Sequence, residues 1–192
     1  MSDPSMAELA KNLADTQTAL NVVWTMVAGF LVMFMQAGFA LVETGLTRAK
    51  NAAHTMGMNF LVYSVGIIGF WAVGFGLQMG GVGPMATFGG DPTLAKEFAI
   101  TLGGKTFGLF GHTGFFLSVT DFTPAIAAMF LFQMVFMDTT CTIPTGALAE
   151  RWKLSSFIIF SLVIATIIYP VYGNWVWGGG WLSALNFHDF AG

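Results

Sequence analysis

Three long stretches of this chain contain no charged side chain. No Asp, Glu, Lys or Arg occurs from Thr16 to Val42, from Asn51 to Gly90, or from Leu154 to His188. A helix of about 20 apolar residues is enough to cross a bilayer. Charged residues make up only 9% of the sequence, and so few charges cannot cover a surface exposed to water. The sequence therefore predicts an all-α, polytopic bundle of transmembrane helices.

The ends of the apolar runs give four predicted spans and the start of a fifth. The spans cover about residues 20–42, 56–79, 124–146 and 155–169. The third begins at Thr123 and Pro124, a cap residue followed by proline in the first helical turn. The fourth is expected to stop at Pro170, because proline disrupts a helix interior. External loops are expected at 80–123 and 170–189, and the whole chain, 1–192, is treated as one domain.

The short loops between spans carry the basic residues that set orientation. Arg48 and Lys50 lie in one loop, and Arg151 and Lys153 lie in another on the same side. Short loops rich in Lys and Arg tend to face the cytoplasm. We therefore expect a multi-pass protein of the cell (inner) membrane, with the amino terminus and both long loops outside.

Several classes of function are disfavoured by composition. A net charge of -3 gives no basic patch for nucleic acid. Cys141 is the only cysteine, and His54, His112 and His188 show no metal-ligand spacing. The chain offers no plausible nucleophile pair and no phosphate-binding loop. We therefore expect no enzyme activity, no cofactor and no metal.

The third span carries a stripe of aromatic and polar residues. Phe132, Phe136 and Thr140 are spaced by four residues, which places them on one face at about 100° per residue, and Gln133 borders that face. Asp138 lies roughly 200° round the helix from Phe136 and faces away. From this pattern alone, lipid contact or helix packing is the favoured interpretation of the two phenylalanines.

Trp177 follows the fourth span, close to the expected external mouth. Aromatic faces attract small cations by about 0.5 to 2 kcal/mol, so Trp177 with the phenylalanine stripe could recognise one. A tryptophan at this depth could also belong to the interfacial aromatic belt. Spacing alone leaves both interpretations open.

Three motifs at the ends of predicted spans resemble one known family. The run from Glu43 to Asn51 is similar to E-x-G-x-x-R-x-K-N, and the run from Gly146 to Arg151 is similar to G-A-x-A-E-R. Trp177 opens W-G-x-G, which leads into D-F-A-G at 189–192. In this order they resemble the amino-terminal portion of the ammonium transporter (Amt/Mep/Rh) family, from about Asp15 onwards. That family has a larger fold with two pseudo-symmetric halves.

The resemblance implies a role for each residue that matches the motifs. Phe136 and Trp177 would recruit external ammonium or methylammonium, with Phe132 beside them, and Phe136 would also gate a hydrophobic pore. Asp189 would hold the external mouth in shape. Gln133 and Thr140 are candidates for the pore lining. The family also implies a homotrimer and a cytoplasmic nitrogen-regulatory protein as a partner.

An alternative of another class is an ammonium sensor, which binds the ion and signals through a fused or partner domain without conducting. Sequence beyond Gly192 would decide between them, since the family's pore histidines are expected there. These 192 residues alone are expected not to transport, because four spans provide only one wall of a pore.

Two acidic residues have expected structural roles. Asp138 lies at membrane depth, where an ionisable group is costly, and we expect an interhelical hydrogen bond to satisfy it. Glu43 is expected to pair with cations of the neighbouring loop at the inner face.

Overall fold

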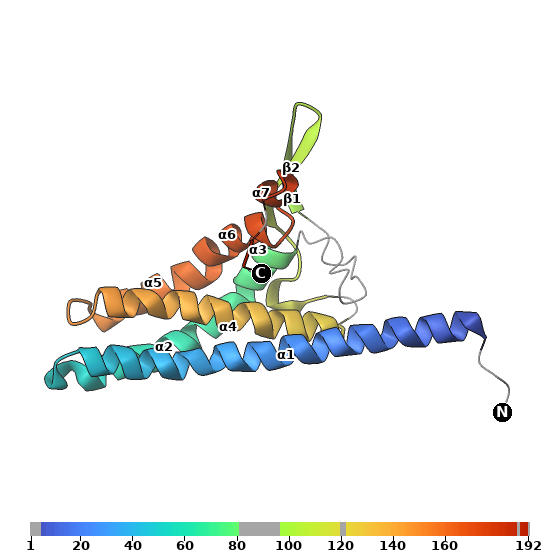
Figure 1. The fold of residues 1–192 in the computed structure, drawn as a ribbon. Coiled ribbons are helices and arrows are strands. Elements are labelled where there is room, and N and C mark those ends of the chain that lie inside the picture. The colour runs from blue at the N-terminus through green and yellow to red at the C-terminus, as the bar shows by residue number, and fades with distance from the viewer. Residues whose placement is uncertain (1–4, 81–96, 120–121, 188, 192) are drawn as a thin grey trace.

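The computed structural model describes residues 5–80, 97–119, 122–187 and 189–191. In these residues, four helical stretches are long and apolar enough to cross a membrane. Figure 1 shows them as α1 and α4 lying side by side, with α2 packed against both and the α5–α6 stretch leaning away from α4. The fold is therefore a helical bundle, as the sequence predicts.

The helical stretches are built from the following elements. The first is α1 (Met6–Leu46), and the second joins η1 (Ala49–Asn51), α2 (Ala52–Gly69), the π-helical turn η2 (Phe70–Gly74) and α3 (Phe75–Met79). The third is α4 (Pro124–Ala147). The fourth joins α5 (Leu154–Val163), the π-helical turn η6 (Ile164–Ile168) and α6 (Tyr169–Val176), and α7 (Trp181–Ala184) follows it.

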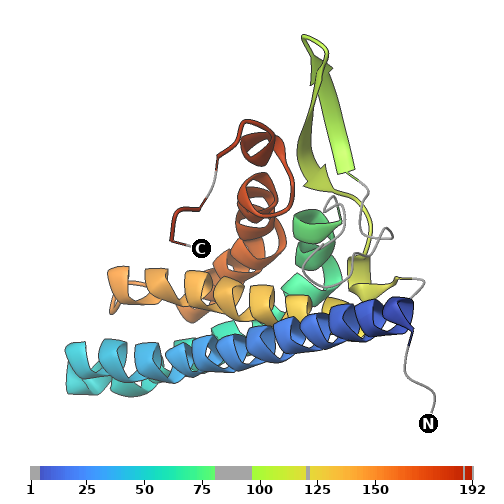
Figure 2. The same cartoon turned by 45° about the vertical axis from the view of Figure 1, so that its right-hand side comes forward.

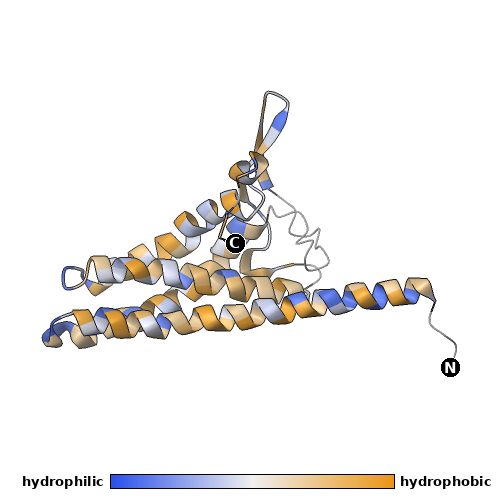
Figure 3. Cartoon of the chain, viewed as in Figure 1, coloured by the Kyte–Doolittle hydropathy of each residue, from blue (hydrophilic) through white to orange (hydrophobic). Residues whose placement is uncertain are grey.

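Helix α1 begins well before the predicted span at 20–42. The hydroxyl of Ser5 accepts a hydrogen bond from the backbone N–H of Glu8 at 3.2 Å, and the Glu8 carboxylate accepts one from the Ser5 N–H at 3.1 Å. This capping box satisfies N–H groups that a helix start leaves free. The 41 residues of α1 extend about 60 Å at 1.5 Å per residue, and Figure 3 shows hydrophilic positions gathered in its amino-terminal part.

The prediction that the fourth span stops at Pro170 is wrong. The helical stretch continues through Pro170 to Val176, so Asn174 and Trp175 are helical and do not lie in a loop. Pro170 lies in the first turn of α6, directly after η6. A wide π-helical turn relaxes the hydrogen-bond pattern of the preceding turn, and the missing N–H of proline is tolerated there.

The two π-helical turns pack against each other. At their crossing Gly74 lies so close to the backbone of Ala165 and to the ring of Pro170 that a side chain has no room. Beyond the crossing, α3 and α6 lie against each other. Both helices thus reach the same end of the bundle.

A β-hairpin that the sequence analysis did not predict stands beyond that end. Strands β1 (Glu97–Leu102) and β2 (Lys105–Gly111) pair antiparallel, and Gly103 and Gly104 turn the chain with φ angles of 58° and 77°. Figure 2 shows the hairpin projecting past α3 and α7. The indole N–H of Trp175 donates to the carbonyl of Leu109 at 2.9 Å, which fastens the hairpin to α6. A short helix, η5 (Phe115–Leu117), follows.

The expected loop at 80–123 therefore contains ordered secondary structure. Residues 81–96 and 120–121 of that loop, and His188, lie outside the described residues. The glycine pair was a usable signal, because adjacent glycines readily adopt the positive φ angles of a tight hairpin turn.

At the opposite end of the bundle, the first two sequence motifs contact each other. Arg48 and Glu150 form an ion pair at 2.6 Å, and the same carboxylate accepts from the Arg48 backbone N–H at 2.7 Å. The Arg48 guanidinium holds the pKa of Glu150 near 2, well below its usual range. Glu43 accepts a hydrogen bond from the backbone N–H of Gly146 at 3.1 Å. The loops after α1 and α4 are joined in this way.

Within the described residues, Glu43 accepts hydrogen bonds from neutral donors and forms no ion pair with a loop cation, so that expectation is wrong. Its second carboxylate oxygen accepts from the Asn59 amide at 2.8 Å, and Thr142 donates to Asn59 at 2.7 Å. Glu43 and Asn59 are buried, and together with Gly146 and Thr142 they connect α1, α2 and α4. The nearby Arg48 is already committed to Glu150, which leaves Glu43 to neutral donors.

Candidate functional site

A cavity of about 290 Å³ opens between α3, the amino-terminal half of α4 and α6. We call it the aromatic pocket. Its lining comprises Met79, Met129, Phe132, Gln133, Phe136, Tyr169, Trp177 and Asp189. The pocket thus brings together all the site residues expected from the sequence except Thr140, although they come from segments far apart in the chain.

Helix α4 supplies the phenylalanine wall of the aromatic pocket. The N-cap hydroxyl of Thr123 accepts from the Ile126 N–H at 3.3 Å, and Pro124 occupies the first turn. The rings of Phe132 and Phe136 then lie 4.9 Å apart. Thr140 continues the stripe, but its hydroxyl donates to the carbonyl of Phe136 at 2.9 Å and its side chain does not line the pocket.

Trp177 closes the opposite wall from the carboxyl end of α6. Its backbone N–H donates to the Gly173 carbonyl at 2.8 Å, and its ring is held edge-on to Tyr172 with ring centres 5.8 Å apart. Carbonyl groups at the carboxyl end of a helix carry partial negative charge, which favours a nearby cation. The sequence analysis did not predict a helix end beside Trp177, because it expected the helix to stop at Pro170.

Asp189 lies at the rim of the aromatic pocket and is exposed. One of its carboxylate oxygens accepts from the backbone N–H of Ala191 at 3.1 Å. The carboxylate therefore fixes the local turn and adds negative potential at the rim.

A buried hydrogen-bonded chain supports the floor of the pocket. The side-chain carbonyl of Gln133 accepts from the Gln78 amide at 2.6 Å and from the Tyr169 hydroxyl at 3.3 Å. The backbone carbonyl of Gln78 accepts from the Asn174 amide at 3.0 Å. Sequence reasoning missed Gln78, Tyr169 and Asn174. Each is a single polar residue in an apolar run, and its hydrogen-bond partner lies on another helix.

Glu97 at the base of the hairpin extends this chain outward. Burial raises the pKa of Glu97 to about 7, and a hydrogen bond from the Asn174 side chain partly offsets the increase. Oε1 of Glu97 is buried and has no hydrogen-bond partner among the described residues. Its carboxyl group fills the space where a side chain on Gly108 would lie.

Hairpin docking should therefore depend on pH. The folded state binds the Glu97 proton more tightly than the unfolded state does, so stability is highest below the ordinary pKa of 4.5 and falls as pH rises through about 7. Glu97→Gln should remove this dependence, because the amide stays neutral. The pH dependence can be measured by hydrogen–deuterium exchange of the β1 and β2 backbone amides. Exchange is compared below pH 4.5 and above pH 7, after correction for the intrinsic rates. Equal pH dependence in the wild type and the variant would contradict the assignment.

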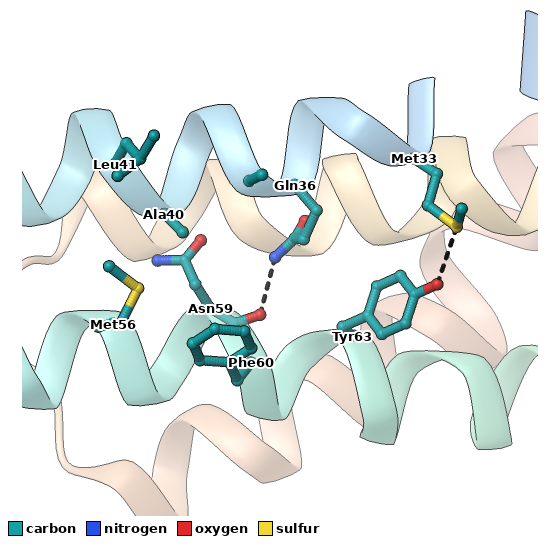
Figure 4. Close-up of a pocket in the computed structure, with 9 residues that line it drawn as sticks. Met33, Gln36, Ala40, Leu41, Met56, Asn59, Phe60 and Tyr63 are labelled. Carbon is teal, nitrogen blue, oxygen red and sulfur yellow. Dashed lines mark hydrogen bonds between the residues drawn. The ribbon is translucent and has the colours of Figure 1, made fainter. Parts of the chain in front are cut away.

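A second cavity, of about 420 Å³, lies between α1 and α2. In Figure 4, Gln36 donates to the backbone carbonyl of Asn59 and the Tyr63 hydroxyl donates to the sulfur of Met33, at 2.8 and 3.1 Å. These donors connect the two helices, and the remaining lining is largely apolar, including Leu41 and Phe60. This groove lacks the charge and the facing aromatic rings that make the aromatic pocket a candidate for cation binding.

Comparisons with known proteins cover most of the chain. The model of the Ammonium Transporter Family matches residues 23–192. Ammonium transporter Amt2 of Archaeoglobus fulgidus is 39% identical over 97% of this chain and 34% of its own length. Ammonium transporter Amt2 of Haloferax mediterranei is 35% identical over 97% of this chain and 37% of its own. The chain thus spans about a third of these curated relatives.

A solved structure described as a sensor Amt protein is also similar. It superposes with a TM-score of 0.76 at 33% sequence identity, over 93% of this chain and 40% of that chain. The structural similarity therefore extends over nearly all of the present chain.

Proposed function

The chain belongs to the Ammonium Transporter Family, and from this premise we propose that it is the amino-terminal portion of a membrane protein that transports ammonium. Its relatives are ammonium transporters, and its apolar helices fit a multi-pass membrane protein. The observation that carries the proposal is the aromatic pocket, where Phe136 and Trp177 face one cavity with Asp189 at its rim.

The pocket has three features that favour a small cation. Aromatic side chains line two of its walls, and an aromatic face is worth about 0.5 to 2 kcal/mol to a bound cation. The carboxyl end of α6 and the Asp189 carboxylate add negative potential. Ammonium loses hydration on entry, so its N–H groups also need acceptors, and we expect the remaining part of the polypeptide to supply some of them.

Gln133 is better suited to positioning than to direct binding. A side-chain carbonyl has two lone pairs, and those of Gln133 are occupied by Gln78 and Tyr169. Gln133 therefore holds α3, α4 and α6 in register beneath the aromatic walls. Phe136, about one turn further along the same helix, is the residue we propose as the gate to a hydrophobic pore, with Phe132 beside it.

Trp177→Leu in the full-length protein should raise the ammonium or methylammonium concentration for half-maximal uptake by about 2- to 30-fold, the factor that corresponds to one cation–π contact. Uptake of labelled methylammonium at low concentration measures the effect. Trp24→Leu is the matched control, since Trp24 is exposed on α1 and lies outside the pocket. Unchanged half-saturation in a folded Trp177→Leu protein would remove this residue from the site.

The sensor reading stays a second candidate because a sensor Amt protein is among the similar structures. It predicts ammonium binding without flux in the full-length protein, whereas the transporter predicts both. A homotrimer and a cytoplasmic nitrogen-regulatory partner belong to the same proposal and rest on the family alone.

A further inference from the structure

Asp138 is a buried carboxylate that takes no part in the aromatic pocket. It lies on α4 and is 1% exposed, and neither of its oxygens has a hydrogen-bond partner among the described residues. The interhelical hydrogen bond expected from the sequence is therefore not formed there. A buried polar group without a partner requires an explanation.

The carboxyl group points at the backbone of α2. A Cβ built on Gly66 would lie 2.8 Å from Oδ1 of Asp138 and 3.3 Å from Met137. Glycine at this position lets α2 and α4 close around the acid. Because both oxygens are already enclosed by described residues, a further segment of the polypeptide could reach them only by displacing that packing.

The titratable side chains near Asp138 cannot supply a positive charge to balance an ionised carboxylate. Tyr63 of α2 and Cys141 of α4 are close enough to interact with it. The Tyr63 hydroxyl donates to Met33 at 3.1 Å, and the Cys141 thiol is directed to Met137 and Ser161. In the described part of the chain no cationic side chain pairs with Asp138.

We propose that Asp138 is a proton-binding site within the membrane, separate from the aromatic pocket, with its carboxyl group neutral in the folded protein. An ionised carboxylate without partners in an apolar interior is far more costly than the neutral acid, so the group takes up a proton. A calcium or magnesium ion would need about six or more oxygen ligands, whereas Met137 and Cys141 bring sulfur to this part of the core. Loss of the proton would place an unpaired charge between α2 and α4 and weaken their contact.

Infrared spectroscopy of the full-length protein in lipid tests this directly. With ¹³C-labelled aspartate, the wild type should show the carbonyl stretch of a protonated carboxyl group at neutral pH, and Asp138→Asn should lose it. Asp15→Asn is the matched control, since Asp15 is exposed on α1 and lies outside the aromatic pocket, and its removal should leave the band intact.

Absence of the band in the wild type at neutral pH would overturn the proposal, and so would a band that persists in a folded Asp138→Asn protein. If that variant does not fold, titration of the labelled wild type decides. The band should survive at pH values where exposed aspartates are fully ionised, and its disappearance together with theirs would contradict the site.

Discussion

Glu43→Ala is expected to destabilise the folded protein by about 1 to 3 kcal/mol, since it deprives one N–H of the buried Asn59 amide of its acceptor. The Glu43 carboxylate accepts from that amide at 2.8 Å and from the exposed backbone N–H of Gly146 at 3.1 Å. Water cannot replace the carboxylate readily, because Asn59 is buried between three helices. Unfolding of the purified protein in mixed micelles, followed by denaturant titration, measures the change.

Glu150→Ala is the matched control at the same end of the bundle. It removes the ion pair with Arg48 and the acceptor of the Arg48 backbone N–H, but Arg48 is exposed to water, so both donors regain hydration. Exposed pairs of this kind contribute little to stability, so the loss should be much smaller than for Glu43→Ala. Equal destabilisation by the two alanine variants would show that burial does not set the importance of Glu43.

Gly74→Val is expected to destabilise the crossing of the two π-helical turns by about 3 kcal/mol, the upper part of the usual range for overpacking. A side chain at this position would meet the backbone carbonyl of Ala165 and the ring of Pro170. Neither of these can rotate away as a flexible side chain would, so the helices themselves must move apart. Thermal unfolding and the fraction of monodisperse protein after extraction measure the effect.

Gly38→Ala provides the contrasting substitution. Gly38 lies within α1, and nothing lies within 4 Å of a Cβ built there. Alanine should therefore stabilise the helix by about 0.5 to 1 kcal/mol, because it restricts the unfolded chain more than glycine does. If Gly74→Val were as well tolerated as Gly38→Ala, the close approach at the crossing would not be a constraint.

The sequence predicted those features that depend on local pattern. Charge-free runs located three of the four helical stretches, and the four-residue spacing of Phe132 and Phe136 placed both rings on one wall of the aromatic pocket. Thr123 with Pro124 marked the start of α4 correctly. Each of these signals lies within a few residues of the structure it specifies.

Features that depend on distant partners could not be predicted in this way. The helix passes through Pro170 because η6 precedes it and α3 packs alongside, and neither fact is visible in the local sequence. Gln78 and Asn174 acquire their importance only when α3 and α6 meet. Glu43 was expected to pair with loop cations at the inner face, whereas its donors come from α2 and from the end of α4.

The paired π-helical turns also determine which length changes each helix can accept. A π-helical turn accommodates one residue more than an α-helical turn, and one residue corresponds to a rotation of about 100°. Deleting one residue within η2 would restore a regular α-helix but would turn Gln78 away from Gln133. Deleting one residue within η6 would likewise turn Asn174 away from Gln78. The extra residue in each π-helical turn thus sets the direction in which the side chains of α3 or α6 point. A change of length in either turn alone would separate Gln78 from one of its partners.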